Sequence, residues 1–366
     1  MEHPLRYAAT PAERCALYEA ALAPPPPDPR LAAALHLGRG RIALAAGPTP
    51  DRVAHLTRAA ALGAEHGAPE LAAEALTAWA QSVHLTSWGP GSGALALAER
   101  ACEAAPVPRA VALRAVLRAH AGAALDREAV RSAVVACGGR VRMRFDVAVL
   151  TVGAALAAGD VAFSAELRAL ADDAARTLGD PVRIAAVQVL AAQDAGHAGR
   201  IDDCIAALEG ALPVLRAHRV DGLVLRARTL LLTARSHLGH HALAEALCDA
   251  LVAERTLAGD AAGRRACQCD RCLLLLDQGR VAAAEALYRD LRADADPSPP
   301  LRRDLAVVGA LLALAGAEPA DAVAAVVRGL DGPPDPRTRL RLDAIAAVAR
   351  VLDGRPPGTV DPTGGG

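Results

Sequence analysis

The densest group of chemically reactive side chains in this sequence is the run Cys267-Gln268-Cys269-Asp270-Arg271-Cys272. Thiolates suit zinc or redox chemistry when the chain brings several of them to one point. On a helix only Cys269 and Cys272 share a face, because side chains align every three or four residues. The eight cysteines of the chain are otherwise scattered, which is typical of reduced thiols. We therefore expect the run to fill apolar positions, with metal ligation as the alternative.

Histidines and paired carboxylates form further candidate metal sites. The segment from His237 to His241 contains three histidines around Gly239, and a chain reversal at that glycine would keep the imidazoles from converging. Asp172-Asp173 and Asp202-Asp203 are similar to the paired carboxylates that hold magnesium in terpenoid synthases, but neither has a third acid at the right helical step. We interpret these groups as exposed polar positions and predict no metal and no cofactor.

Two patterns bear on catalysis. The loop Trp88-Gly89-Pro90-Gly91-Ser92-Gly93 is rich in glycine, but a phosphate-binding loop also needs a lysine, which this chain lacks. Two Trp, three Tyr and two Phe are too few aromatic side chains to line the cationic pocket of an isoprenoid-type enzyme. We therefore predict no catalytic residues and keep an all-helical enzyme as the less favoured alternative.

The elements that must position these side chains follow from an internal repeat between Val141 and Asp296. Four glycines stand 40 residues apart and each separates two apolar runs: Gly159, Gly199, Gly239 and Gly279. Five positions after each glycine stands a small side chain: Ser164, Cys204, Ala244 and Ala284. Glycine ends a helix cheaply in the left-handed conformation, and a small residue lets two helices approach. The spacing predicts an all-α fold of antiparallel helix pairs, stacked as a right-handed solenoid.

Three columns of the repeat predict which face of each first helix is buried. Their members recur at helical spacing and are mostly compact and apolar. They are Val147/Val187/Ala227/Cys267, Val149/Val189/Thr229/Cys269 and Val152/Ala192/Leu232/Cys272. Between units, the segments Gly179-Asp180-Pro181, Val220-Asp221-Gly222 and Gly259-Asp260 each offer an aspartate, which we expect to cap the following helix.

The regular repeats cover only part of the chain. We expect an N-terminal helix and a proline-rich stop at residues 1–28 and irregular helix pairs at 29–140, with three short helices between Ala94 and Cys137. Regular 40-residue repeats follow at 141–296, and degenerate repeats with a closing helix at 297–353. Residues 354–366 have the proline and glycine content of a disordered tail.

Composition narrows the function classes further. The chain has 40 basic and 41 acidic residues and no run of like charges, so we do not expect it to bind nucleic acid by itself. The first residues carry charges where a signal peptide needs an apolar run, and the longest apolar stretches are 13 residues, too short to span a bilayer. These features favour a cytoplasmic protein without membrane insertion.

Three segments carry a resemblance to known proteins: 176–181 (Arg-Thr-Leu-Gly-Asp-Pro), 199–203 and 279–287. The helix-pair pattern resembles the tetratricopeptide repeat, although that repeat has about 34 residues and first-helix aromatics that are absent here. The segments look more like the C-terminal repeat region of large actinobacterial ATP-dependent regulators of the LuxR and maltose-activator type, over about residues 30–330. The resemblance implies a regulatory or ligand-sensing scaffold. A stand-alone fragment working beside separate ATPase and DNA-binding parts is the alternative.

A polar column eleven residues before each glycine gives the candidate binding site. It consists of Ala148, Gln188, Arg228 and Gln268, and Arg235 lies two turns after Arg228. Tetratricopeptide-like proteins grip peptides and acidic termini with such rows, in which arginine pairs with carboxylate. The hypothesis is that Gln188, Arg228, Arg235 and Gln268 contact a protein or peptide, in a non-catalytic scaffold. A small effector is the second candidate ligand, and a solvated stripe is the alternative.

Overall fold

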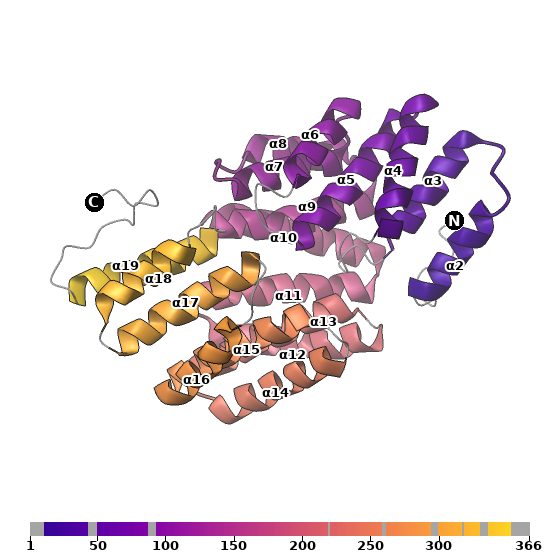
Figure 1. The fold of residues 1–366 in the computed structure, drawn as a ribbon. Helices are drawn as coiled ribbons and strands as arrows, with labels where there is room; N and C mark the ends of the chain where they lie inside the picture. The colour runs from indigo at the N-terminus through magenta and orange to yellow at the C-terminus, as the bar shows by residue number, and fades with distance from the viewer. Residues whose placement is uncertain are drawn as a thin grey trace. The chain divides into compact units, whose positions relative to one another are not determined.

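The computed structural model describes residues 11–42, 50–86, 93–218, 220–257, 261–293, 299–316, 318–329 and 336–352. Within these ranges the regular structure is entirely α-helical, and no strand occurs (Figure 1). The all-α prediction is confirmed. Most of the glycine-rich loop that begins at Trp88 lies outside the described residues, as does the 354–366 segment.

The chain divides into two compact units, Met1–Val187 and Gln188–Gly366. The first contains α2 (Pro11–Leu22), α3 (Pro29–Gly40), α4 (Pro50–Glu65), α5 (Pro69–Thr86), α6 (Ala94–Ala104), α7 (Pro108–His120), α8 (Arg127–Ala136), α9 (Val141–Ala157) and α10 (Val161–Leu178). Helix α11 (Pro181–His197) crosses the boundary. The second contains α12 (Ile201–Ala217), α13 (Asp221–His237), α14 (His241–Leu257), α15 (Ala261–Asp277), α16 (Val281–Arg292), α17 (Pro299–Ala315), α18 (Pro319–Gly329) and α19 (Pro336–Leu352). The expected divisions after residues 28, 140 and 296 stay predictions.

Helix boundaries recur every 40 residues from α9 to α16. The first helices of these pairs begin at Val141, Pro181, Asp221 and Ala261, and the second helices begin at Val161, Ile201, His241 and Val281. Each pair turns at one of the four marker glycines, whose φ angles are 75°, 74°, 71° and 70° in chain order. The glycines therefore end the first helices in the left-handed conformation, as expected.

The same hydrogen bonds close each of these turns. At the first, the amide of Gly159 donates to the carbonyl of Leu156 (3.0 Å) and the amide of Asp160 donates to that of Ala155 (2.9 Å). The three later turns repeat both bonds at 2.8–3.2 Å. These bonds give a donor to carbonyl groups that would otherwise have no hydrogen-bond partner at the end of the helix.

Of the two predicted aspartate caps that lie within the described residues, one forms. The Asp180 carboxylate accepts from the amides of Val182 (3.0 Å) and Arg183 (3.2 Å) at the start of α11. At α13 the cap residue is Val220, which has no side-chain cap, and Asp221 is already the first helical residue. Asp260 lies outside the described residues. Asp160, which was not predicted as a cap, accepts from the amide of Phe163 (3.2 Å).

The apolar columns lie in the core as predicted. All four members of the 147 column, all four of the 152 column and all four small residues that follow the glycines are buried. In the 149 column Val189 and Cys269 are buried, whereas Val149 and Thr229 are half-buried. Small side chains at these crossing points let paired helices pack closely, so each pair depends on its neighbours for burial.

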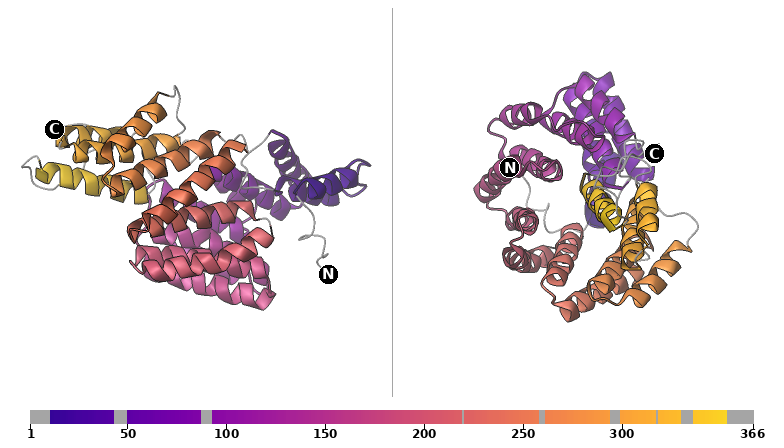
Figure 2. Two further views of the ribbon diagram at one scale, coloured as in Figure 1. Left: turned by 90° about the horizontal axis from the view of Figure 1, so that it is seen from below. Right: turned by 90° about the vertical axis from the view of Figure 1, so that its left-hand side faces the viewer.

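Neighbouring helices pack against one another within each unit. In the first unit α3 packs on α4 and α4 on α5, and α5 also contacts both α3 and α7. In the second unit α12 to α16 pack consecutively, and α15 contacts α17 (Figures 1 and 2). Several first helices therefore contact both their own partner and the next first helix along the chain, as α5 and α15 do.

In the irregular part of the first unit α3, α4, α5 and α7 begin at prolines, and α6 and α8 have only 11 and 10 residues. The three short helices predicted between Ala94 and Cys137 are α6, α7 and α8. Gly63 on α4 allows one close approach, because a Cβ atom there would lie 2.7 Å from the backbone nitrogen of Ala72 on α5. Among the described helices, none is both long enough and apolar enough to cross a membrane.

Candidate functional site

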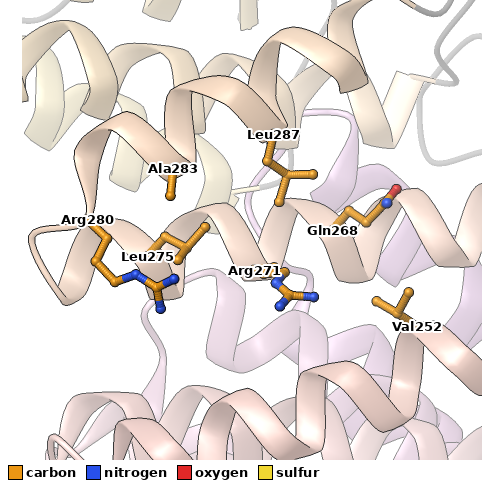
Figure 3. A pocket seen from close by; sticks show the side chains of 7 residues that line it. All are labelled: Val252, Gln268, Arg271, Leu275, Arg280, Ala283 and Leu287. Atoms are coloured by element: carbon orange, nitrogen blue, oxygen red, sulfur yellow. The ribbon is translucent and has the colours of Figure 1, made fainter.

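Three consecutive helices of the second unit enclose a groove with a volume of about 280 Å³ (Figure 3). One lining residue comes from α14, three come from α15, and three come from α16 and its N-cap. They are Val252, Gln268, Arg271, Leu275, Arg280, Ala283 and Leu287. We call this set the α15–α16 groove. It contains one of the four side chains that the sequence predicts to bind a partner, Gln268.

Helical spacing brings the lining residues together. Gln268, Arg271 and Leu275 lie three and four residues apart along α15, so they share one face. The three residues of α16 and its cap have the same spacing. Because the turn at Gly279 reverses the chain, the two rows face each other and run in opposite directions.

The groove has different chemistry at its two ends. Figure 3 shows Arg280 at the end near the turn, Arg271 in the middle, and Gln268 with Val252 at the opposite end. Leu287 lies on the α16 side, between Arg271 and Gln268 in this view. A ligand would therefore meet guanidinium groups from the turn end to the middle, and mainly aliphatic groups with one amide at the other end.

Both arginines are held by carboxylates of α14 that do not line the groove. The Nη1 atom of Arg271 lies 2.7 Å from Asp249 Oδ1. Arg280 Nη1 donates to Glu245 Oε1 (2.7 Å) and to Gln278 Oε1 (3.1 Å). The arginine side chains are 42% and 54% exposed, and exposed pairs of this kind contribute only about 0–1 kcal/mol. Each guanidinium has five N–H donors, and these contacts use only those on Nη1.

The aliphatic lining is anchored in the core of the second unit. Leu275 is 6% exposed. Leu287 packs against the buried cluster that contains Cys272 and Leu291. Val252 packs against the cluster of Leu232, Cys248, Leu251 and Cys267. The apolar surface is therefore preformed, and a ligand does not have to order it.

The groove coincides with two departures from the repeat. The column of Arg271 holds Thr151, Ala191 and Leu231 in the other pairs, all buried or half-buried. The column of Ala283 holds Phe163, Asp203 and Leu243. In this pair alone a long cation replaces a compact side chain on the first helix, while a single methyl group stands on the second. Both departures are visible in the sequence, but the predicted binding row was taken from a different column of the repeat.

The structure gives the four residues of the predicted binding row unequal environments. Gln188 on α11 is exposed, and Gln268 is half-buried in the groove. On α13, Arg235 is half-buried and Arg228 is only 7% exposed. Ala148, the first member of the column, is fully buried. The row is therefore not uniformly accessible, and its contact with a partner stays a prediction.

Different neighbouring helices hold the two arginines of α13. Arg228 Nη1 donates to the Glu254 carboxylate of α14 (2.5 Å), and Arg235 Nη2 donates to Glu209 Oε1 of α12 (2.7 Å). Helices α12 and α14 both pack on α13. The two guanidinium groups are therefore paired with acids of two different helices.

The cysteine run fills the core, as the sequence predicts. Cys267, Cys269 and Cys272 are at most 5% exposed and occupy apolar columns. Burial raises the pKa of the Cys272 thiol to about 11, and burial, followed by the nearby Asp270 charge, raises the pKa of Cys248 to about 12. Burial raises the pKa of Cys269 as well. These thiols are neutral at physiological pH and are poor nucleophiles.

Three of the four carboxylates in the acidic pairs accept hydrogen bonds from arginines. Asp172 accepts from Arg176 (2.8 Å), Asp173 accepts from Arg144 (3.1 Å), and Asp203 accepts from the cap residue of its own helix (3.2 Å). In the part of the chain that the structure describes, no group of three or more His, Cys, Asp or Glu side chains could hold a metal ion.

The first unit contains a charge ladder that the sequence analysis missed. Glu74 on α5 contacts Arg41 at the end of α3 and accepts from Arg109 on α7 (3.3 Å), and Arg109 also contacts Asp146 on α9. The four side chains are 12–31% exposed. Their unequal sequence spacing hides the pattern. Because opposite charges alternate, the ladder ties first helices together and leaves little net charge for a ligand.

Two comparisons with known proteins return no match. No protein-family model matches the chain, and neither does any curated protein.

Proposed function

We propose that this chain is a non-catalytic scaffold that binds a protein or peptide segment, in a regulatory or signal-sensing role. In this proposal the helix pairs form a right-handed solenoid similar to tetratricopeptide arrays. Such arrays bind partners on extended surfaces made by successive repeats. The α15–α16 groove is the observation that supports a binding role most strongly.

The groove has the make-up of a recognition site for side chains. Its lining combines aliphatic groups anchored in the core with three polar side chains, Gln268, Arg271 and Arg280. Preformed apolar surface with a few convergent polar groups is the common composition of binding sites. Its volume of about 280 Å³ is just below the range of small-molecule sites and suits one or two side chains of a peptide.

Selection from a peptide display library tests the proposal. The wild-type chain is expected to retain a family of related peptides, whereas Ala283→Phe fills the groove and loses them. Ala282→Phe is the matched control, because it adds the same ring at the adjacent exposed position, which does not line the groove. Retention of the same peptides by wild type and Ala283→Phe would contradict binding in this groove. Recovery of no related peptides from the wild type would contradict the proposed function.

A further inference from the structure

We infer that the α15–α16 groove recognises a peptide segment in which an acidic side chain and an aliphatic side chain lie about three residues apart. This inference rests on the proposed function and specifies its ligand. It follows from the charge of the lining, from the position of its apolar surface and from the length of the groove.

Charge complementarity selects the acidic residue. Among the seven lining residues the charged groups are Arg271 and Arg280, and the carboxylates that pair with them, Asp249 and Glu245, stand outside the lining. The charged groups that a ligand in the groove contacts are therefore guanidinium groups and not carboxylates. Arginine presents these donors in a planar fork that fits a carboxylate through two parallel hydrogen bonds. An incoming carboxylate can use this fork without displacing Asp249 or Glu245 from Nη1.

The aliphatic residue follows from the other end of the groove. Val252 on α14 and Leu287 on α16 are half-buried, and Gln268 is the polar group beside them. An aliphatic side chain placed there covers apolar surface that is already ordered. The Gln268 amide can donate to, or accept from, the backbone of an extended peptide that passes along the groove.

The length of the groove sets the spacing of the two side chains. Gln268 and Leu275 are seven residues apart on α15, which is about 10 Å along a helix axis. An extended peptide covers about 10 Å in three residues. With the acid at the Arg280 end and the aliphatic side chain at the Gln268 end, the segment is acid-x-x-aliphatic, or the same pair in reverse order. A peptide fits better than a cofactor, because both arginines are 42% or more exposed, whereas a small-molecule site usually encloses most of its ligand.

Binding of defined peptides by fluorescence anisotropy tests the inference with the full-length chain. The probes are two fluorescein-labelled glycine-serine peptides. One carries Glu-Gly-Gly-Leu and the other carries Leu-Gly-Gly-Glu. Three matched peptides replace Glu with Gln, Glu with Lys, or Leu with Ala. Wild type should bind the Glu/Leu peptide about tenfold or more tightly than the Gln/Leu peptide, because a charge-assisted fork is lost. Raising the salt concentration should weaken the first and leave the second nearly unchanged.

Variants of the groove assign the effect to its arginines. Arg271→Ala and Arg280→Ala should each weaken the Glu/Leu peptide about five- to tenfold, and Arg271→Lys should have an intermediate effect, because it keeps the charge without the fork. Arg289→Ala is the matched control, since Arg289 pairs with Glu285 on α16 but does not line the groove. The double variant Arg271→Glu/Arg280→Glu should prefer the Lys/Leu peptide. Circular dichroism confirms that each variant is folded.

The outcomes separate this inference from the proposed function. If the Glu and Gln peptides bind equally well, or if the library returns peptides without acids that Ala283→Phe rejects, the acidic preference is wrong and the binding role stands. If neither the defined peptides nor the library gives a peptide that wild type binds and Ala283→Phe rejects, both proposals fail. Both proposals are supported if the wild type and Arg289→Ala bind the Glu/Leu peptide more tightly than the Gln/Leu peptide and Arg271→Ala does not.

Discussion

The junction of α8 with α10 in the first unit and the junction of α14 with α16 in the second each join two second helices of successive pairs, with different side chains. At the third residue of α10, Phe163 is 1% exposed, and the Cζ atoms of Arg127 and Arg131 on α8 lie 5.9 and 5.2 Å from the centre of its ring. At the third residue of α16, Ala283 presents one methyl group to the groove. At this column a buried ring thus fills one junction, and a single methyl group leaves the other open.

The charges at the two junctions are also reversed. Asp160, the residue before α10, pairs with Arg127 on α8 (2.5 Å). Arg280, the residue before α16, pairs with Glu245 on α14 (2.7 Å). The repeat therefore fixes where a cap charge lies but not its sign. At the second junction a cation stands at this position and a small residue stands three positions later, and both line the α15–α16 groove.

Opening the filled junction should have the largest effect. Phe163→Ala removes a buried ring and leaves a cavity, so the free energy of unfolding should fall by about 3–5 kcal/mol. Urea unfolding followed by tryptophan fluorescence measures it, because both tryptophans fall within residues 1–187. Val161→Ala is the control: this side chain, also on α10, is 59% exposed and should contribute under about 0.5 kcal/mol. A loss below 1 kcal/mol for Phe163→Ala would mean that the ring does not hold the junction.

Acid should weaken the first unit mainly through the buried His84. His84 on α5 is 8% exposed and stacks on His120 of α7 with ring centres 5.0 Å apart. Burial, followed by the nearby His120 charge, lowers the pKa of His84 to about 4. Since the unfolded chain binds this proton near pH 6.5, the contribution is complete above pH 6.5 and is lost as the pH falls toward 4, by about 3 kcal/mol in total.

The tryptophan-detected urea midpoint should therefore decrease from pH 7 to pH 4.5, and His84→Leu should decrease less. Some dependence should remain in the variant, because burial also lowers the pKa values of His36 and His55. Equal slopes for wild type and His84→Leu would show that His84 does not carry this acid sensitivity.

Replacing the turn glycines should affect both regions equally. Gly159→Ala and Gly279→Ala force a Cβ atom into φ angles of 75° and 70°, so each should cost about 1–2 kcal/mol. Gly153→Ala within α9 is the control, because no atom lies within 4 Å of its added Cβ, and it should stabilise by up to about 1 kcal/mol. Thermal unfolding followed by circular dichroism compares the three. Clearly unequal costs at the two turns would contradict their common backbone plan.

Removing the guanidinium of Arg280 should have the smallest effect on stability. The pair between Arg280 and Glu245 is 54% and 37% exposed, so Arg280→Ala should change the free energy of unfolding by less than about 1 kcal/mol. Chemical denaturation measures this change. A small value assigns any loss of peptide binding by this variant to the missing guanidinium. A loss of several kcal/mol would make Arg280 a structural residue.

Much of the fold was predictable because the repeat depends on local chemistry. Glycine permits the left-handed turn, and the small residue five positions later must be buried, so Gly159 and Ser164 identify a helix pair without knowledge of its neighbours. The same columns correctly placed Cys267 and Cys272 in the core. The short helices between Ala94 and Cys137 followed from prolines and glycines that interrupt the chain.

The candidate site was less predictable because it depends on contacts between elements. Gln268 was selected from the sequence and lines the groove. Arg228 was selected for the same column, but Glu254, 26 residues later, holds its guanidinium in a buried position. Arg271 stands out against Thr151, Ala191 and Leu231 at the same column. The sequence alone does not show that Val252 of the preceding helix lines the same groove as Arg271.

The most direct test of the central claim is hydrogen–deuterium exchange of the full-length chain with and without a peptide selected from the library. The account predicts added protection in α14, α15 and α16 around Val252, Arg271 and Ala283, and none in the Ala283→Phe variant. Protection confined to α11 and α13 around Gln188 and Arg228 would contradict it and would locate binding on the polar row instead.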